Sequence, residues 1–178
     1  MEARLMPALH EKVFPTAEGE VRLLLLIDAF GASGMNGRTQ LAKTDFFVRY
    51  PRYLREALTR LGVPQDETTA PELDIEQRMI RYRYGPWDPT YFTLLGRLRS
   101  RRLIRWVRDG GVGFRTTESG HDLANRFRTI TEWQATDDRA ALVAKHLRWS
   151  GERLRRFIYD AFPEVVGMKW GQEIPDAP

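Results

Sequence analysis

Cysteine is absent from this chain of 178 residues. Without thiols the protein has no disulfide scaffold, no thiolate metal site and no cysteine nucleophile. The apolar run from Leu23 to Ile27 is far too short to cross a bilayer. The first residues also lack the charged region, apolar region and cleavage site of an export signal. We therefore expect a cytoplasmic protein with no membrane partner.

Residues that carry catalysis or hold cofactors are also sparse. The histidines, His10, His121 and His146, lie far apart in the sequence, and none has a second metal ligand at helical spacing. The glycines around Gly110 are followed by no lysine and no helix start, which argues against a phosphate-binding loop. No serine has the sequence context of a nucleophile elbow. The sequence therefore predicts a protein that is not an enzyme, with no catalytic residue, no metal and no cofactor.

Lysine is scarce, because only Lys12, Lys43, Lys145 and Lys169 contribute to the 28 basic residues. The rest are arginines, whose planar guanidinium suits phosphate, guanine edges or carboxylates. A GC-rich genome would produce the same bias without functional meaning. A net charge of +4 permits nucleic-acid contact without requiring it. An apolar content of 42% is sufficient for one compact domain with a core.

The segment from Arg78 to Gly120 is the most informative part of the chain. After a short strand-like run, Asp88 is expected to cap a helix with Pro89 at its first position, and this helix extends to about residue 102. Two strands over 103–107 and 112–116 then meet at the glycine turn 109–111. Helix, strand, glycine turn and strand in this order are typical of a winged helix.

The apolar pattern predicts further helices on both sides of this segment. A helix over 17–30 is apolar nearly all round, which predicts a place at the centre of a core, and helices over 39–49 and 51–61 follow. After the hairpin, Thr117, Thr136 and Ser150 are expected to cap three more helices. The predicted fold class is mainly α, a winged helix-turn-helix domain with a small β-hairpin wing and a C-terminal helical extension. The expected divisions are an arm (1–15), the winged-helix domain (16–130), the helical extension (131–163) and a tail (164–178).

The predicted helix 88–102 has one core face and one polar face. Tyr91, Leu94, Leu95 and Leu98 share the first, whereas Thr93, Arg97 and Ser100 share the second. With the arginines that follow, the candidate nucleic-acid-binding residues are Thr93, Arg97, Ser100, Arg101, Arg105 and Arg108. No Asn or Gln lies among them to form the bidentate contact that selects adenine. Phosphate contact without sequence preference, or protein pairing through arginine, fits this set better than base reading.

The last predicted helix carries a candidate partner-binding stripe. Its residues are Leu154, Phe157 and Ile158, with Arg153 and Arg156 beside them. Because the helix follows a complete winged helix, we expect part of this stripe to be surplus to the core and to bind a partner. On this hypothesis Phe157→Asp abolishes partner binding and leaves stability unchanged. Several aromatic residues, Trp87, Phe92 and Trp106 among them, are either core packing or part of an interface.

Two segments carry a resemblance to a known family. GRTQLAKTDFFVRYP (37–51) and RYRYGPWDPTYFTLLGRLRSRRLI (81–104) together resemble the small winged-helix middle component of bacterial three-component ABC-ATPase systems, a group that includes Lamassu-type anti-phage defence. The resemblance covers about residues 17–130. In such systems an SMC-like ATPase senses foreign DNA, an effector (often a nuclease) acts, and the small subunit joins the two. The YGPW–DP element also occurs in other winged-helix modules, including antitoxin-like ones.

The resemblance implies a non-catalytic subunit that bridges an SMC-like ATPase and an effector nuclease, with duplex DNA as a further, sequence-independent partner. Two other hypotheses use the same fold. A winged-helix transcriptional regulator would form a symmetric dimer with recognition helices one turn of DNA apart. An antitoxin-like adaptor would bind and neutralise a toxin.

Overall fold

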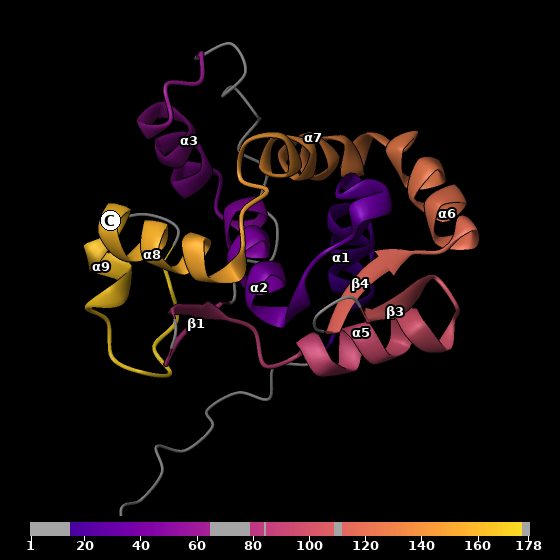
Figure 1. Ribbon diagram of the computed structural model, residues 1–178, viewed down its shortest axis with the longest axis horizontal. Coiled ribbons are helices and arrows are strands. Elements are labelled where there is room, and N and C mark those ends of the chain that lie inside the picture. Colours follow the sequence, from indigo (N-terminus) through magenta and orange to yellow (C-terminus); the bar gives the residue numbers. More distant parts are fainter. Residues whose placement is uncertain (1–14, 65–78, 84, 109–111, 176–178) are drawn as a thin grey trace, which may run out of the picture.

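The computed structural model describes residues 15–64, 79–83, 85–108 and 112–175 of the chain (Figure 1). Helices dominate it, and two small two-stranded antiparallel sheets accompany them, which confirms the mainly α class. The expected arm and the glycine turn 109–111 lie outside the described residues, apart from Pro15. In the described part no helix combines the length and the apolar character needed to cross a bilayer.

The described helices and strands have the following bounds along the chain. The helices are α1 (Ala17–Ala29), the 3-10 turn η1 (Gly31–Ser33), α2 (Gly37–Arg49), α3 (Pro51–Arg60), α5 (Tyr91–Ser100), α6 (Glu118–Arg128), α7 (Thr131–His146), α8 (Gly151–Ala161) and α9 (Pro163–Val166). The strands are β1 (Ile80–Tyr82), β2 (Gly85–Trp87), β3 (Ile104–Arg108) and β4 (Val112–Thr116).

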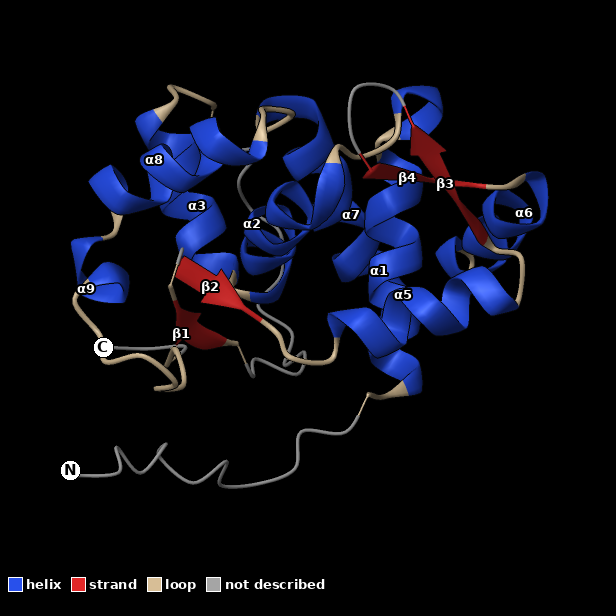
Figure 2. Ribbon diagram, turned by 60° about the horizontal axis from the view of Figure 1, so that its bottom comes forward, coloured by secondary structure: helices blue, strands red, loops and turns tan. Residues whose placement is uncertain are grey.

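Two helices, α1 and α2, form the centre of the molecule (Figure 2). Thr16 caps α1 by accepting a hydrogen bond from the Gly19 amide at 3.0 Å, and Leu23 to Ile27 are all buried. The expected central position of this helix is confirmed. α1 packs against α5, α6, α7 and β4, whereas α2 packs against α3, α7, α8 and β2. Because apolar side chains surround both helices, neither could be stable in water without these neighbours.

Met35, in the connection between α1 and α2, forms a β-bridge with strand β4 of the β3–β4 hairpin. In the hairpin Trp106 pairs with Phe114. The Met35 amide donates to the Phe114 carbonyl at 2.8 Å, and the Phe114 amide donates to the Met35 carbonyl at 2.9 Å. A Cβ on Gly113 would lie 2.5 Å from the Met35 oxygen, so only glycine permits this approach.

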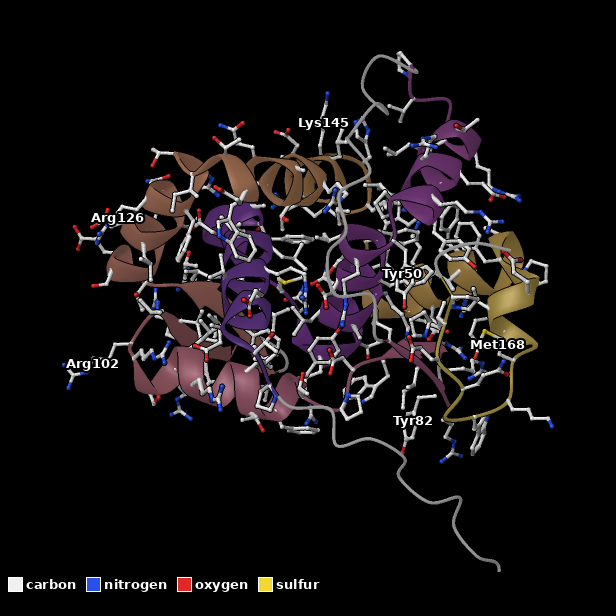
Figure 3. The ribbon with its side chains drawn as sticks, turned by 180° about the vertical axis from the view of Figure 1, so that it is seen from behind. Tyr50, Tyr82, Arg102, Arg126, Lys145 and Met168 are labelled. Carbon is white, nitrogen blue, oxygen red and sulfur yellow. The ribbon has the colours of Figure 1, made fainter. Side chains whose placement is uncertain are left out.

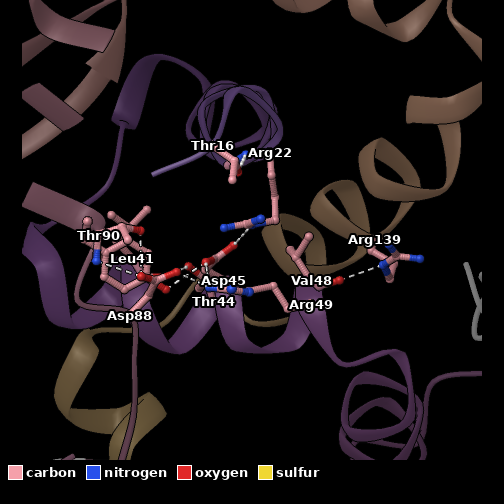
Figure 4. Close-up of polar contacts among 12 residues, drawn as sticks. Thr16, Arg22, Leu41, Thr44, Asp45, Val48, Arg49, Asp88, Thr90 and Arg139 are labelled. Carbon is pink, nitrogen blue, oxygen red and sulfur yellow. Dashed lines mark hydrogen bonds and ion pairs between the residues drawn. The ribbon is translucent and has the colours of Figure 1, made fainter. Parts of the chain in front are cut away.

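A buried ionic cluster links α1, α2 and the start of α5 (Figure 4). Asp45 on α2 has no exposed surface, and it accepts from Arg22 Nε at 2.8 Å and from the Tyr91 hydroxyl at 2.7 Å. Burial, together with the neighbouring Asp45 charge, raises the pKa of Tyr91, so the hydroxyl stays protonated and remains a donor. The cluster therefore orients α5 against the two central helices.

Asp88 belongs to the same cluster, which corrects the expected start of α5. Its carboxylate pairs with Arg49 and accepts from the Thr90 amide at 2.7 Å. Burial alone would raise the pKa of Asp88, but the Arg49 charge and these hydrogen bonds outweigh it, and the net shift is downward. The helix itself begins at Tyr91 with Thr90 at the N-cap position. The helix is therefore shorter than the expected 88–102, but Asp88 Oδ1 still accepts from an amide two residues along the chain, as a capping side chain does, while Oδ2 pairs with Arg49 on α2.

The two caps expected at Thr117 and Ser150 are confirmed, and the one at Thr136 is wrong. Thr117 accepts from the Gly120 amide at 3.0 Å, and Ser150 accepts from the Arg153 amide at 3.2 Å. Thr136 lies inside α7, which runs without a break from Thr131 to His146. Its side chain is fully buried against the core, so packing overrides its local preference for a helix start.

The residues after 130 do not form an appendage. Leu147, Leu154 and Phe162 belong to the same buried cluster as α1 and α2. The expected tail also packs, because the Ile174 amide donates to the Met79 carbonyl at 2.8 Å and the Tyr50 hydroxyl donates to the Ile174 carbonyl at 2.9 Å. The division into a winged-helix domain, an extension and a tail is therefore wrong, since α7, α8 and the tail complete one core.

Candidate interaction surface on α5 and the β3–β4 hairpin

The helix α5 divides into a core face and an outer face as the sequence predicts. Its core residues, Tyr91, Leu94, Leu95 and Leu98, are buried against α1 and the hairpin. Its outer residues, Phe92, Thr93, Gly96, Arg97, Arg99 and Ser100, are exposed. The outer face has two sides, one beside the start of α1 and one beside the hairpin, and the two sides differ in chemistry.

On the α1 side, two arginines share one carboxylate. Arg97 and Arg101 each place Nη1 on Glu20, at 3.3 Å and 2.6 Å. The Glu20 side chain is only 6% exposed, whereas those of Arg97 and Arg101 are 43% and 63% exposed. Arg97 also donates to the Pro15 carbonyl at 3.2 Å. One carboxylate against two guanidinium groups leaves a single net positive charge, so this side is less basic than its sequence indicates.

On the hairpin side, α5 and the strands enclose a cavity of about 660 Å³. We call this space the α5–hairpin groove, and its lining consists of Arg38, Phe92, Leu95, Gly96, Arg99, Ser100, Trp106, Val112 and Phe114. A Cβ built on Gly96 meets no atom within 4 Å, so the missing side chain leaves space open. Phe92 is 60% exposed although it is a large apolar residue. Exposed apolar side chains beside open space make this surface a candidate interaction site.

Arginines stand over the aromatic residues of the groove. The Arg38 Cζ atom lies 4.6 Å from the centroid of the Phe92 ring, and the Arg99 Cζ atom lies 5.5 Å from a Trp106 ring centroid. The lining contains no carboxylate, so neither cation is neutralised within it. An apolar floor with a cationic rim is suited to an apolar side chain that carries or neighbours an acidic group.

The structure does not gather the predicted nucleic-acid-binding residues into one surface. Arg97 and Arg101 turn to Glu20, and Ser100 lines the groove while its hydroxyl donates to the Arg97 carbonyl at 2.9 Å. Arg105 is exposed, and it lies opposite Arg115 in the register of β3 and β4.

Side chains alternate along a strand, so Arg105 lies on the hairpin face opposite Trp106. Thr93 is exposed, and the side chain of Arg108 lies outside the described residues. The sequence interpretation missed Arg38, Gly96 and Arg99 as groove residues. The helical spacing of Phe92, Gly96 and Arg99 is the signal that could have indicated their common side.

The predicted partner-binding stripe on α8 belongs to the core. Leu154 and Ile158 have no exposed surface. Phe157 is half-buried, with its ring centroid 5.3 Å from that of Trp149 and 6.4 Å from that of Phe47. The hypothesis of a surplus apolar stripe was therefore wrong, because α8 covers α2 and its stripe fills the space between them.

Arg153 and Arg156, which were assigned to the same partner-binding stripe, both contact nearby residues in α8 or just before it. The Arg153 Cζ atom lies 4.1 Å from a Trp149 ring centroid, and Arg156 Nε lies 3.1 Å from Glu152. Both side chains are on the surface, so they remain open to a partner although the apolar residues between them are not.

Comparison with protein families, with curated proteins and with solved structures finds no match to this chain.

Proposed function

We propose that this protein is a non-catalytic winged-helix subunit that bridges an SMC-like ATPase and an effector nuclease in an anti-phage defence complex. The order of elements supports the fold assignment. A helix (α1), one strand-like residue (Met35), a helix (α2), a further helix (α5) and a hairpin follow one another, as in a winged helix. On this assignment α3 and the β1–β2 hairpin are an insertion between the second and third helices.

The α5–hairpin groove is the observation that carries the proposed function. A winged helix that reads DNA places its recognition helix, here α5, in the major groove. Phe92 and Trp106 instead give this surface aromatic character, and arginines cover both rings. Aromatic residues and arginine are enriched at the centres of protein interfaces. We therefore assign the groove to the SMC-like ATPase, which would insert an apolar side chain that lies beside a carboxylate.

Gly96 offers a direct test of this assignment. Gly96→Trp fills the groove from an exposed position where an added Cβ meets no atom within 4 Å, so the substitution leaves the packing of the core face of α5 in place. Gly96→Ala is the matched control, because it removes glycine from a helix interior and adds only a methyl group. Each variant is co-expressed with the SMC-like ATPase and the nuclease that the proposal expects to be encoded beside the gene, and complex formation is measured by size-exclusion chromatography.

We expect Gly96→Ala to form the complex and Gly96→Trp to lose the ATPase, with the same far-UV circular dichroism for both. If Gly96→Trp binds the ATPase as well as Gly96→Ala does, the groove is not the contact surface. If the wild-type protein forms no complex with either neighbour, the subunit proposal itself is wrong.

DNA contact within this proposal is limited to phosphates. We expect weak duplex binding without sequence preference, with an affinity that falls steeply as salt rises, because each phosphate contact contributes a slope of about −0.9 to the log–log plot. Removing Arg97, Arg101 and Arg108 together should abolish this binding. A tight footprint over two half-sites would instead favour the transcriptional regulator.

A further inference from the structure

A second cavity lies against the β1–β2 hairpin, and a buried lysine lines it. Its volume is about 170 Å³, and its lining is Thr39, Lys43, Tyr82, Gly85 and Trp87. Tyr82 projects from β1 at the edge of the molecule (Figure 3), and its ring centroid lies 6.3 Å from that of Trp87. The Lys43 residue is only 2% exposed. Its Nζ donates one hydrogen bond, to the Pro86 carbonyl at 3.0 Å, and an ammonium group has two further N–H donors.

Two arginines add positive charge around Lys43. Arg81 on β1 is buried, its Nε donates to the Val166 carbonyl at 3.1 Å, and its Nη1 has no hydrogen-bond partner in the described part of the chain. Arg155 on α8 also acts on the charge of Lys43 and lies near the same Tyr159 ring as Arg81. The Cζ atoms of Arg81 and Arg155 lie 6.0 Å and 5.6 Å from the centroid of the Tyr159 ring.

Nearby carboxylates do not neutralise the positive charges of Lys43 and Arg81. Among the described residues, no carboxylate forms an ion pair with Lys43 or Arg81. Glu152 pairs with Arg155 at 2.7 Å and with Arg156 at 3.1 Å, so its charge is shared between them. A buried cation without a counter-ion is unfavourable. Burial, followed by the charges of Arg81 and Arg155, accordingly lowers the pKa of Lys43 to about 7.

Gly85 keeps the space beside the amine open. Its φ of +96° is in the left-handed region, and a Cβ there would lie 3.4 Å from Lys43 Nζ and 3.7 Å from Tyr159 Cε2. A side chain at this position would narrow the cavity at the amine. The amine is therefore the buried polar end of a small cavity that has aromatic side walls.

We propose that this cavity binds a small oxyanion, a carboxylate or phosphate group, through the Lys43 ammonium. The anion would supply the negative charge that Lys43 and Arg81 lack, and Tyr82 and Trp87 would contact its organic part. This site is separate from the α5–hairpin groove and does not depend on the proposed function.

The scarcity of lysine makes the proposal testable by NMR. Only four lysines are present, so lysine labelled with ¹³C at Cε and ¹⁵N at Nζ gives few signals, and the pKa of Lys43 is lowered to about 7. Sodium sulfate, a stand-in for phosphate that does not titrate in this range, and sodium acetate are added at constant ionic strength. We expect the Lys43 signal to shift saturably and its midpoint to move to higher pH, because the anion binds the ammonium form.

Lys43→Met removes the Lys43 signal and so assigns it, and Lys169→Met, the same change at an exposed residue, should keep the saturable shift of Lys43. The wild-type titration stands even if Lys43→Met fails to fold. A response to sulfate alone identifies a phosphate site, a response to acetate alone identifies a carboxylate site, and a response to both supports a general oxyanion site. If neither anion shifts the Lys43 signal at a lower concentration than it shifts the Lys169 signal, the proposal is overturned.

Discussion

Asp45→Asn should be among the most destabilising single changes in this protein. Asp45 is fully buried, with Arg22 Nε at 2.8 Å, the Tyr91 hydroxyl at 2.7 Å and Arg49 Nη1 at 3.6 Å. An amide of the same shape removes the charge and replaces one acceptor oxygen with a donor that faces other donors. Arg22 then keeps a buried charge without its carboxylate partner, and its Nη1 already lacks a hydrogen bond.

Removing one partner of a buried ion pair costs about 3–5 kcal/mol, a large part of the roughly 5–15 kcal/mol of a typical domain. With an m-value of about 2 kcal/mol per molar, the urea midpoint should fall by about 2 M, followed by circular dichroism. Asp160→Asn, at an exposed position, is the matched control and should change the midpoint little. If the two variants unfold at the same urea concentration, the cluster does not hold α1, α2 and α5 together, and our account of how α5 is positioned is wrong.

Three further predictions use the same denaturation assay. Leu98→Ala should cost about 2–5 kcal/mol, because the side chain is buried beneath α5; a loss below this range would mean that α5 repacks. Phe157→Asp should now lower the melting temperature markedly, since a charge would enter the contact with Trp149; an unchanged melting temperature would restore α8 as a docking surface. The pKa of Lys43 is about 7 in the folded state, whereas that of a fully solvated lysine is 10.5, so the unfolded chain binds more protons between these limits. Stability should therefore rise with pH above about 7, by at most about 1.4 kcal/mol per pH unit, and Lys43→Met should lack this rise.

Local patterns in the sequence were sufficient for most of the helices and for the β3–β4 hairpin. The continuous apolar run at Leu23 predicts a buried helix, and α1 is one. Thr117 and Ser150 were recognised as caps because a cap depends on a hydrogen bond only three residues along the chain. The same short-range reasoning failed at Thr136, where α7 continues because distant helices bury it.

The candidate site was predicted in part. Periodicity separated the core face of α5 from its outer face, and the exposed positions of Thr93, Arg97 and Ser100 are confirmed. Periodicity could not indicate that Glu20, far away in the sequence, would take up Arg97 and Arg101. Nor could it place Arg38 over Phe92, because that contact joins the start of α2 to α5.

The sequence by itself determined the mainly helical class, the position of α1 in the core and the hairpin after α5, because each of these follows from side-chain spacing along a few turns or strands. Only the tertiary structure decided which charges are neutralised and which apolar helix faces are left exposed outside the core. Asp88 was expected only as a helix cap, and the structure adds a buried ion pair with Arg49; the apolar stripe of α8 was expected to bind a partner, and it packs in the core. Charge pairing and burial depend on which distant segments meet, and the local sequence around each residue does not specify that.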